Sequence, residues 1–373
     1  MQKIAYILGA GFSKPLGLPI MSDFIDMAKD LYSRDSQKYS YFSDVFRFIH
    51  DDLAWVKTVY EADLNNIEEV LSILEMLHIL DKVREKAVIE YKRFLSDVID
   101  YYTPKFNMPS NLTRIERGDY LSDEELLHTI ARTRARNIQA QASNFYFPSS
   151  LIKNYIYFVL GLFNAKLETT SVEKALRITC TSIENPYAEY SIITLNYDLI
   201  LEKIASFLSN FAKGKEIRFS SGGATDKFPV IAHLHGSVDH QNIIPPTWQK
   251  TIDKTIEEDW QTAYDRLGSA NHIRIIGYSL PITDSYIRYL LKASILKNNE
   301  LKSINVLCLD RWGTIKKRYD EFIKLPPEKY QFLDTDVTSY LASAADRVVQ
   351  GLLMDDAPKL FSSDWVNPFL PKS

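Results

Sequence analysis

The residue types best suited to hold a nucleotide phosphate follow the first apolar run of the chain, Ile4–Leu8. Glycines after a strand let the backbone turn sharply and bring amide groups close to a pyrophosphate, at the start of a following helix. The segment is not a Walker A loop, and Lys14 stands where a GxGxxG fingerprint has its third glycine. A tight strand-to-helix turn without a ligand is the alternative. The candidate binding residues are Gly9, Ala10, Gly11, Phe12 and Ser13.

Polar side chains suited to catalysis follow two later apolar runs. Asn196 and Asp198 come directly after the run YSIITL, where ligands of open α/β sheets bind, although both residue types also cap helices. His235 follows the run VIAHL and precedes Gly236, which fits a general base beside a tightly held ligand. A histidine with a structural role is the alternative for His235.

The histidines at 233 and 235 also raise the question of a metal. Residues at i and i+2 of a strand share one face, so His233 and His235 are predicted to lie side by side. No pattern of cysteine, histidine or carboxylate completes a metal site around them. We therefore predict no metal site and expect no zinc.

Two more apolar runs end in residues that suit a nucleotide. Gly277 and Ser279 follow HIRII and could reach a phosphate or a ribose, while Asp284 could cap the next helix. Asp310 follows INVLCL, and a carboxylate there can accept hydrogen bonds from two ribose hydroxyls. For each residue taken alone, a role in a turn or as a helix cap is the alternative to ligand binding. Because such residues follow every predicted strand, together they indicate one ligand site.

The elements that position these residues alternate between strand and helix. Strands are predicted at 4–8, 190–195, 230–234, 272–276 and 304–309, with helices at 199–211, 254–267 and 284–297. Such alternation predicts an α/β fold, with a Rossmann-like doubly wound parallel sheet. Between the first strand and the rest, helical patterns at 65–80, 82–102 and after Ser122 and Ser150 predict a large all-helical insertion.

The predicted organisation has three parts. The nucleotide-binding part is discontinuous and comprises residues 1–45 and 186–325, while the helical insertion comprises 46–185 and a C-terminal extension 326–373. The basic run at 132–136 is a candidate contact surface, with a solvated helix face as the alternative. The aromatic tail is a second candidate.

Composition narrows the possible classes. A formal net charge of -4 gives no support for a general nucleic-acid or membrane-surface binder. Cys180 and Cys308 lie far apart and make neither a disulfide framework nor a zinc cluster, so we expect a cytoplasmic protein. The apolar stretch Tyr155–Ala165 is short of the ~20 residues that span a bilayer. The N-terminal apolar run is also short for a signal peptide.

The order GAGFSKPLGLP, LNYD, HLHG and GYS resembles the sirtuin family, whose core is a Rossmann-type NAD site. The resemblance implies that the loop from Gly9 to Ser13 binds NAD, together with Gly17 and Pro19 of the GLP stretch. It implies that Asn196 and Asp198 contact the nicotinamide ribose and carboxamide, and that His235 is the catalytic base. It places Gly277 and Ser279 at the adenosine half and Asp310 at the adenosine ribose.

Several departures from sirtuin deacylases are informative. The cysteines of the structural zinc module are missing, GLPIMSDF has no arginine, and Leu195 replaces a glutamine. After His235-Gly236 the chain has IIPPTWQK in place of the peptide-binding strand. In these features the sequence resembles sirtuin-like NAD-hydrolysing effectors of bacterial antiphage defence, which carry a large helical insertion.

That resemblance implies an NAD+ glycohydrolase that releases nicotinamide and ADP-ribose and is regulated, because uncontrolled NAD loss kills the cell. It also implies a homo-oligomer paired with a hexameric DNA-translocase-type ATPase. The alternatives are a non-catalytic sensor of an NAD derivative, a scaffold subunit for an ATPase and an NAD-dependent protein deacylase.

Overall fold

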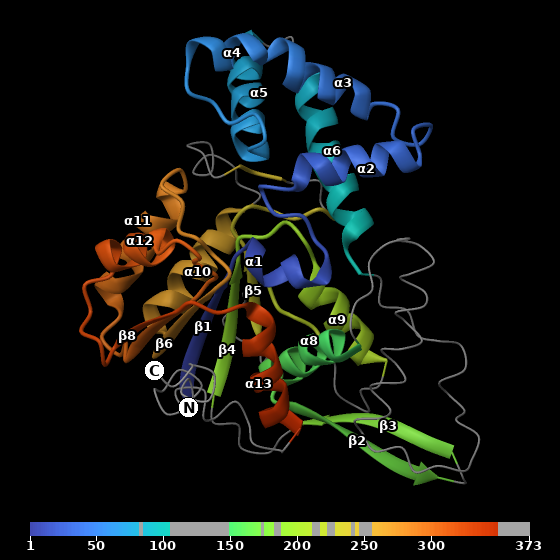
Figure 1. Ribbon diagram of the computed structural model, residues 1–373. Helices are drawn as coiled ribbons and strands as arrows, with labels where there is room; N and C mark the ends of the chain where they lie inside the picture. The colour runs from blue at the N-terminus through green and yellow to red at the C-terminus, as the bar shows by residue number, and fades with distance from the viewer. Residues whose placement is uncertain are drawn as a thin grey trace.

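A parallel sheet of six strands forms the centre of the computed structural model (Figure 1). The strands follow the order β5-β4-β1-β6-β7-β8, and every neighbouring pair is parallel. The structure describes residues 1–81, 85–104, 149–172, 175–182, 188–210, 217–221, 228–239, 243–245 and 256–349. The strands are β1 (Gln2–Leu8), β4 (Ala188–Thr194), β5 (Val230–His233), β6 (His272–Ile276), β7 (Ser303–Leu307) and β8 (Tyr330–Leu333).

The strand order reverses next to β1. From β1 the chain proceeds to β4 and β5 on one side, and then places β6, β7 and β8 on the other side. Open α/β sheets bind ligands where the order reverses, outside the carboxyl ends of the strands, which here means between β1 and β6. The predicted α/β fold with a doubly wound parallel sheet is confirmed. The sheet contains the five predicted strands and one more, β8.

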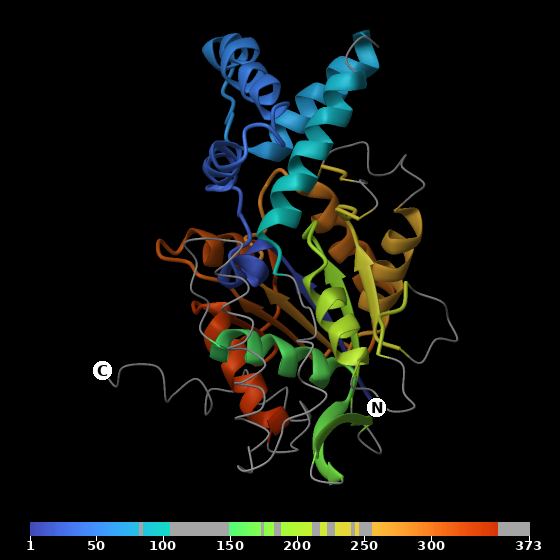
Figure 2. The same ribbon diagram turned by 90° about the vertical axis from the view of Figure 1, so that its right-hand side faces the viewer.

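Helices cover both faces of the sheet (Figures 1 and 2). Alternate residues of β1 belong to two different cores, because successive side chains of a strand point to opposite faces. Ala5 and Ile7 pack with one layer, and Ile4 and Tyr6 pack with the other. The first layer contains α10 (Glu257–Ser269), α11 (Ser285–Ser294), η4 (Ile295–Lys297) and α12 (Thr314–Phe322). The second contains α8 (Ser149–Leu162), α9 (Ile200–Ser209) and α13 (Val337–Val349).

A group of helices lies beyond the carboxyl ends of the strands, at the top of Figure 1. We call it the helical unit. Its centre is aromatic: the ring of Phe94 lies 4.7 Å from that of Phe42 and 6.0 Å from that of Phe24, measured between centroids. The helical unit comprises α2 (Phe24–Arg34), α3 (Phe42–Arg47), η2 (Phe48–Asp52), α4 (Ala54–Val59), α5 (Ile67–Asp81) and α6 (Glu85–Tyr102).

The prediction of an all-helical insertion is wrong at one place. β2 (Ala165–Val172) and β3 (Ala175–Ser182) pair as an antiparallel hairpin, away from the helical unit (Figure 1). Helix α8 ends at Leu162, and Asn164 then adopts a left-handed conformation with φ 47°, which turns the chain out of the helix. The following residues are rich in threonine, which favours strands over helices.

Several predicted features lie outside the described residues. These are the helix after Ser122, the basic run at 132–136 and the aromatic tail at 362–373. The predicted boundaries of the three parts remain predictions. None of the helices in the described ranges is long and apolar enough to cross a membrane.

Candidate functional site

The turn after β1 lies directly against the turn after β6. The Gly9 amide donates to the Ile276 carbonyl at 3.0 Å, and the Gly11 amide donates to the Gly277 carbonyl at 2.9 Å. Gly277 has a φ of 66°, and a Cβ atom there would lie 2.5 Å from the carbonyl carbon of Gly11. A Cβ atom on Gly9 would lie 2.6 Å from the Gly277 oxygen. The glycines therefore allow the two turns to touch.

These contacts change the role expected for the glycine segment. The amides of Gly9, Gly11 and Phe12 donate to protein carbonyls, the last to Gly9 at 2.8 Å. They shape the turn, so they are not the free phosphate donors that the sequence predicted. α1 (Ala10–Ser13) follows at once and continues into the 3-10 turn η1 (Lys14–Leu16), which ends at Gly17 with φ 83°. The missing side chains of Gly9, Gly11 and Gly277 make room for the opposite turn.

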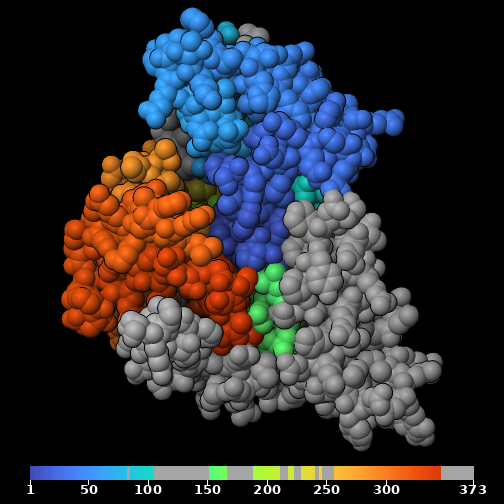
Figure 3. All heavy atoms as spheres, in the orientation of Figure 1, coloured from blue at the N-terminus to red at the C-terminus, as the bar shows by residue number. Residues whose placement is uncertain are grey.

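A cleft of about 460 Å³ opens at this point, at the carboxyl ends of β1 and β6 and below the helical unit. In the space-filling view, N-terminal residues (blue) lie beside C-terminal residues (orange and red) on this side of the molecule (Figure 3). Several predicted site residues line the cleft, together with charged residues from other elements. The lining includes Gly9, Ala10, Gly11, Lys14, Glu68, His235, Gly277, Tyr278, Ser279, Asp284 and Asp336.

A smaller pocket of about 80 Å³ adjoins the cleft and shares Ala10, Leu195 and Glu68 with it. The remaining predicted catalytic residues line this pocket. Its lining includes Ser13, Pro19, Asn196, Tyr197 and Asp198. The structure therefore brings the residues after β1, β4, β5 and β6 together around two adjoining cavities.

Asn196 is held by the turn after β1. Its side-chain amide donates to the Gly9 carbonyl at 3.1 Å and to the Ser13 hydroxyl at 3.2 Å. Its Oδ1 atom is buried and has no hydrogen-bond partner among the described residues. A buried acceptor without a partner costs free energy, so a ligand hydroxyl or water at this atom would be stabilising.

Asp198 ties the loop after β4 to helix α9. Its carboxylate accepts a hydrogen bond from the Ile200 amide at 3.1 Å and another from the Ser13 hydroxyl. Burial raises the pKa of Asp198, and these two hydrogen bonds oppose the shift. The capping role that the sequence left open for this residue is realised.

His235 lies between two carboxylates. Its Nδ1 is 3.9 Å from Oε1 of Glu68, and its Nε2 is 3.5 Å from Oδ2 of Asp284. Asp284 is 1% exposed and accepts a hydrogen bond from the Tyr278 hydroxyl at 2.9 Å. Asp284 is therefore fixed where it can orient the imidazole, which is the usual arrangement around a histidine general base.

Three predicted site residues line neither cavity. The Phe12 ring packs against Tyr155 at 5.3 Å between centroids, in the core. Gly17 ends the 3-10 turn. Asp310 accepts a hydrogen bond from the Lys316 amide at 2.7 Å and so caps α12, which was its alternative in the sequence.

Two residues of the site were missed by sequence reasoning. Asp284 was expected only as a helix cap, although it follows the predicted strand end at Gly277 by a few residues. Glu68 gave no signal, because it occupies an ordinary position in a helix of the insertion. Only the placement of α5 above the sheet brings Glu68 to the cleft.

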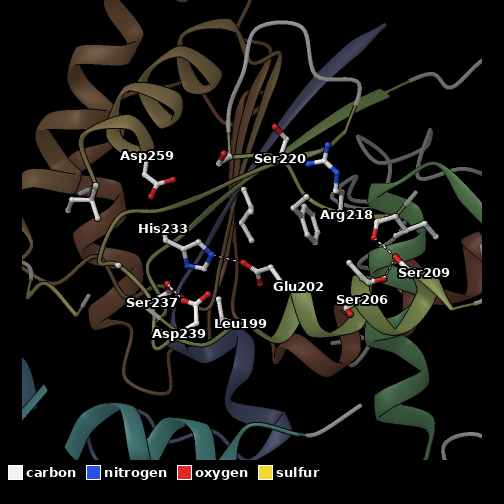
Figure 4. A pocket seen from close by; sticks show the side chains of 17 residues that line it. Leu199, Glu202, Ser206, Ser209, Arg218, Ser220, His233, Ser237, Asp239 and Asp259 are labelled. Carbon is white, nitrogen blue, oxygen red and sulfur yellow. Dashed lines mark hydrogen bonds and ion pairs between the residues drawn. The ribbon is translucent and has the colours of Figure 1, made fainter. Parts of the chain in front are cut away.

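A second cavity, of about 650 Å³, lies next to α9 and β5 (Figure 4). His233 and Glu202 point toward one another there, with 2.6 Å between Nε2 and Oε1. Burial lowers the pKa of His233, but the hydrogen bond and charge of Glu202 outweigh burial and raise it. The expectation that His233 and His235 lie side by side is wrong, because β5 ends at His233 and Gly236 turns the chain with φ 75°.

The two histidines had raised the question of a metal centre. In the part of the chain that the structure describes, no group of three histidine, cysteine or carboxylate side chains could hold a metal ion.

Comparison with known proteins relates part of the chain to one family. Residues 190–324 match the family model of the SIR2-like domain, and this segment contains Asn196, His235 and Gly277. No curated protein sequence matches the chain. Among solved structures, the chain is similar to Sir2 in complex with the inhibitor EX-527, 2'-O-acetyl-ADP-ribose and a deacetylated p53 peptide. The two chains are 10% identical, the match covers 94% of each chain, and the TM-score is 0.33. Because this score is low, the assignment of the fold is based on the strand order described above and not on this likeness.

Proposed function

We propose that the protein is an NAD+ glycohydrolase that cleaves the nicotinamide–ribose bond and releases nicotinamide and ADP-ribose. The observation that carries the proposal is the position of His235. It is buried, it has a carboxylate near each ring nitrogen, and it lines the same cleft as Gly9, Gly11 and Gly277. The match of residues 190–324 to the SIR2-like domain supports NAD as the nucleotide.

The two cavities suit a dinucleotide. Taken together, the cleft of about 460 Å³ and the adjoining pocket of about 80 Å³ have a volume in the range of small-ligand sites. The turns of Gly9, Gly11 and Gly277 line the cleft where a pyrophosphate would lie, and Ser279 at the cleft wall would face the adenosine half. Oδ1 of Asn196 would accept a hydrogen bond from a ribose hydroxyl or from the attacking water.

The chemistry asks little of the protein beyond positioning and proton transfer. The bond between C1' and the pyridinium nitrogen breaks, its electron pair goes to that nitrogen, and nicotinamide leaves as a neutral molecule. Water adds to C1', and His235 accepts the proton that the water loses. Asp198 holds the loop of Asn196 in place through Ile200 and Ser13.

The resemblance described above supports a more specific proposal. The protein would act in the cytoplasm as a regulated antiphage effector that depletes NAD. It would work as a homo-oligomer together with a hexameric DNA-translocase-type ATPase.

The test is nicotinamide release from NAD, followed by chromatography. Wild type is compared with Asn196→Ala and His235→Ala, with His233→Gln as the matched control, because His233 lies in the other cavity. We expect release by wild type and the control, and a loss of about 10²- to 10⁴-fold for His235→Ala. No release by wild type, even with an ATPase partner and DNA, would favour a sensor or scaffold. Turnover only of an acyl peptide would favour a deacylase.

A further inference from the structure

Glu68 reaches the cleft from the helical unit, a part of the chain that the SIR2-like match at 190–324 does not include. It lies in the first turn of α5, which Asn66 starts by accepting hydrogen bonds from the amides of Glu68 and Glu69, both at 3.1 Å. The capped helix start fixes the backbone of Glu68. Its side chain is 19% exposed and lines both the cleft and the adjoining pocket.

The carboxylate of Glu68 contacts both catalytic loops. Oε1 accepts a hydrogen bond from the Tyr197 hydroxyl at 3.2 Å and lies 3.9 Å from Nδ1 of His235. Tyr197 follows Asn196 directly in the chain. Burial, and then the charge of Glu68, raises the pKa of Tyr197 well above its usual value, so its hydroxyl stays a donor. Glu68 therefore sits where the loops after β4 and β5 meet.

We propose that Glu68 is a catalytic carboxylate that faces the reacting ribose and stabilises the positive charge that develops on it. The inference rests on the proposed NAD+ glycohydrolase function. When the bond from C1' to the pyridinium nitrogen breaks, the departing nicotinamide takes the electron pair and the ribose becomes oxocarbenium-like. Glu68 forms no bond and transfers no proton. Its contribution is a fixed negative charge beside the cationic centre.

The other carboxylates near the site are buried or cap a helix. Asp284 is 1% exposed and bonded to the Tyr278 hydroxyl. Asp336 lines the cleft but caps α13, accepting from the Ser339 amide at 3.0 Å. Asp198 is bonded to the Ile200 amide. Among the carboxylates of the described residues around the two cavities, Glu68 combines partial exposure with a place on both walls.

The effect should be large, because the charge acts close to the reacting centre in a largely buried site. A fixed charge about 4 Å from a developing cation is worth a factor of about 10²–10³ in rate at the effective dielectric of a protein. Removing that charge without changing the shape of the side chain should therefore lower kcat by about 10²- to 10³-fold.

The test variant is Glu68→Gln, whose amide oxygen still accepts the hydrogen bond from Tyr197 but carries no charge. Single-turnover nicotinamide release gives the rate of bond breaking. Affinity is measured with an NAD analogue in which a CH₂ group replaces the ribose ring oxygen. The matched control is Glu69→Gln, the next residue on the same helical turn, which lines neither cavity. We expect the predicted loss in rate for Glu68→Gln, with analogue affinity within about threefold of wild type, and no change for the control.

A second variant distinguishes loss of the carboxylate from misfolding. In Glu68→Ala, added formate should restore part of the rate if an anion at this place is what the reaction needs. The role of Glu68 would be overturned if Glu68→Gln reacted at the wild-type rate, or if formate did not rescue Glu68→Ala. In either case, nicotinamide release by wild type would still uphold the proposed function. A wild type that releases no nicotinamide, or a His235→Ala variant that remains fully active, would overturn the proposed function and this inference with it.

Discussion

The contact between the turns after β1 and β6 makes a quantitative prediction about Gly277. Changing Gly277 to alanine would place a methyl group 2.5 Å from the carbonyl carbon of Gly11, and its φ of 66° is unfavourable for alanine. Left-handed strain costs about 1–2 kcal/mol, and forced overpacking adds about 1–3 kcal/mol. Alanine also reduces the entropy of the unfolded chain, which offsets about 0.4–1 kcal/mol. We expect the free energy of unfolding to fall by about 2–4 kcal/mol.

Gly313 provides the matched control for this change. It has nearly the same conformation, with φ 71°, but a Cβ atom there would meet nothing within 4 Å. Gly313→Ala should therefore cost only the strain less the entropy gain, about 0.5–1 kcal/mol. The difference between the two variants isolates the close approach of the two turns.

Both variants are compared by urea unfolding followed by tryptophan fluorescence, and by affinity for the non-cleavable NAD analogue. Gly277→Ala should bind the analogue at least about tenfold more weakly, because the displaced turns form the cleft floor, whereas Gly313→Ala should bind it normally. Equal losses of stability in the two variants would refute the argument, since the turns would then not be in contact as the structure has them.

Two further predictions concern residues outside the cleft. Asp310→Ala removes the cap on α12 and should lower the free energy of unfolding, measured in urea, by about 1 kcal/mol. The affinity for the NAD analogue should stay within about twofold of wild type. A loss of affinity of about tenfold would instead support the ribose contact that the resemblance implied. Burial, with the charge of Arg274, lowers the pKa of His272 from 6.5 to about 4. Below pH 6.5 His272 is therefore protonated in the unfolded chain but stays neutral in the folded chain, so the free energy of unfolding decreases as the pH falls toward 4. His272→Gln should flatten this dependence by about 1 kcal/mol, a value discounted for solvent screening, and an unchanged slope would contradict the assignment.

The sheet was predictable because its strands are buried. Ile4–Leu8 is a continuous apolar run, and Tyr190–Thr194 and His272–Ile276 are rich in isoleucine and buried throughout, as expected when helices cover both faces. β8 escaped prediction because it has only four residues, all of intermediate burial, at the edge of the sheet. The hairpin of β2 and β3 escaped for a different reason. Its second strand does carry a strand signal, because Leu176, Ile178 and Cys180 alternate with polar residues, but the prediction of an all-helical insertion overlooked it.

The same reasoning divides the site into a predictable and an unpredictable half. Asn196, His235 and Gly277 each follow a strand of a parallel sheet, and the carboxyl ends of such strands meet at one edge, so sequence order was enough to bring them together. Asp310 also follows a strand, but its carboxylate caps α12 and lines neither cavity. A position after a strand is therefore not sufficient evidence for a site residue, because a side chain there also serves to cap the next helix.

Glu68 represents the unpredictable half, and its origin has a consequence for control of the site. Its distance to His235 depends on how the helical unit sits above the sheet, because α5 and β5 belong to different parts of the fold. Displacement of a catalytic group by about 1 Å can cost 10²-fold in rate. A contact that shifts the helical unit would therefore change turnover without touching the nucleotide or the sheet. The regulated NAD+ glycohydrolase proposed above could be controlled by such a contact, and turnover by the Glu68→Gln variant should be insensitive to it.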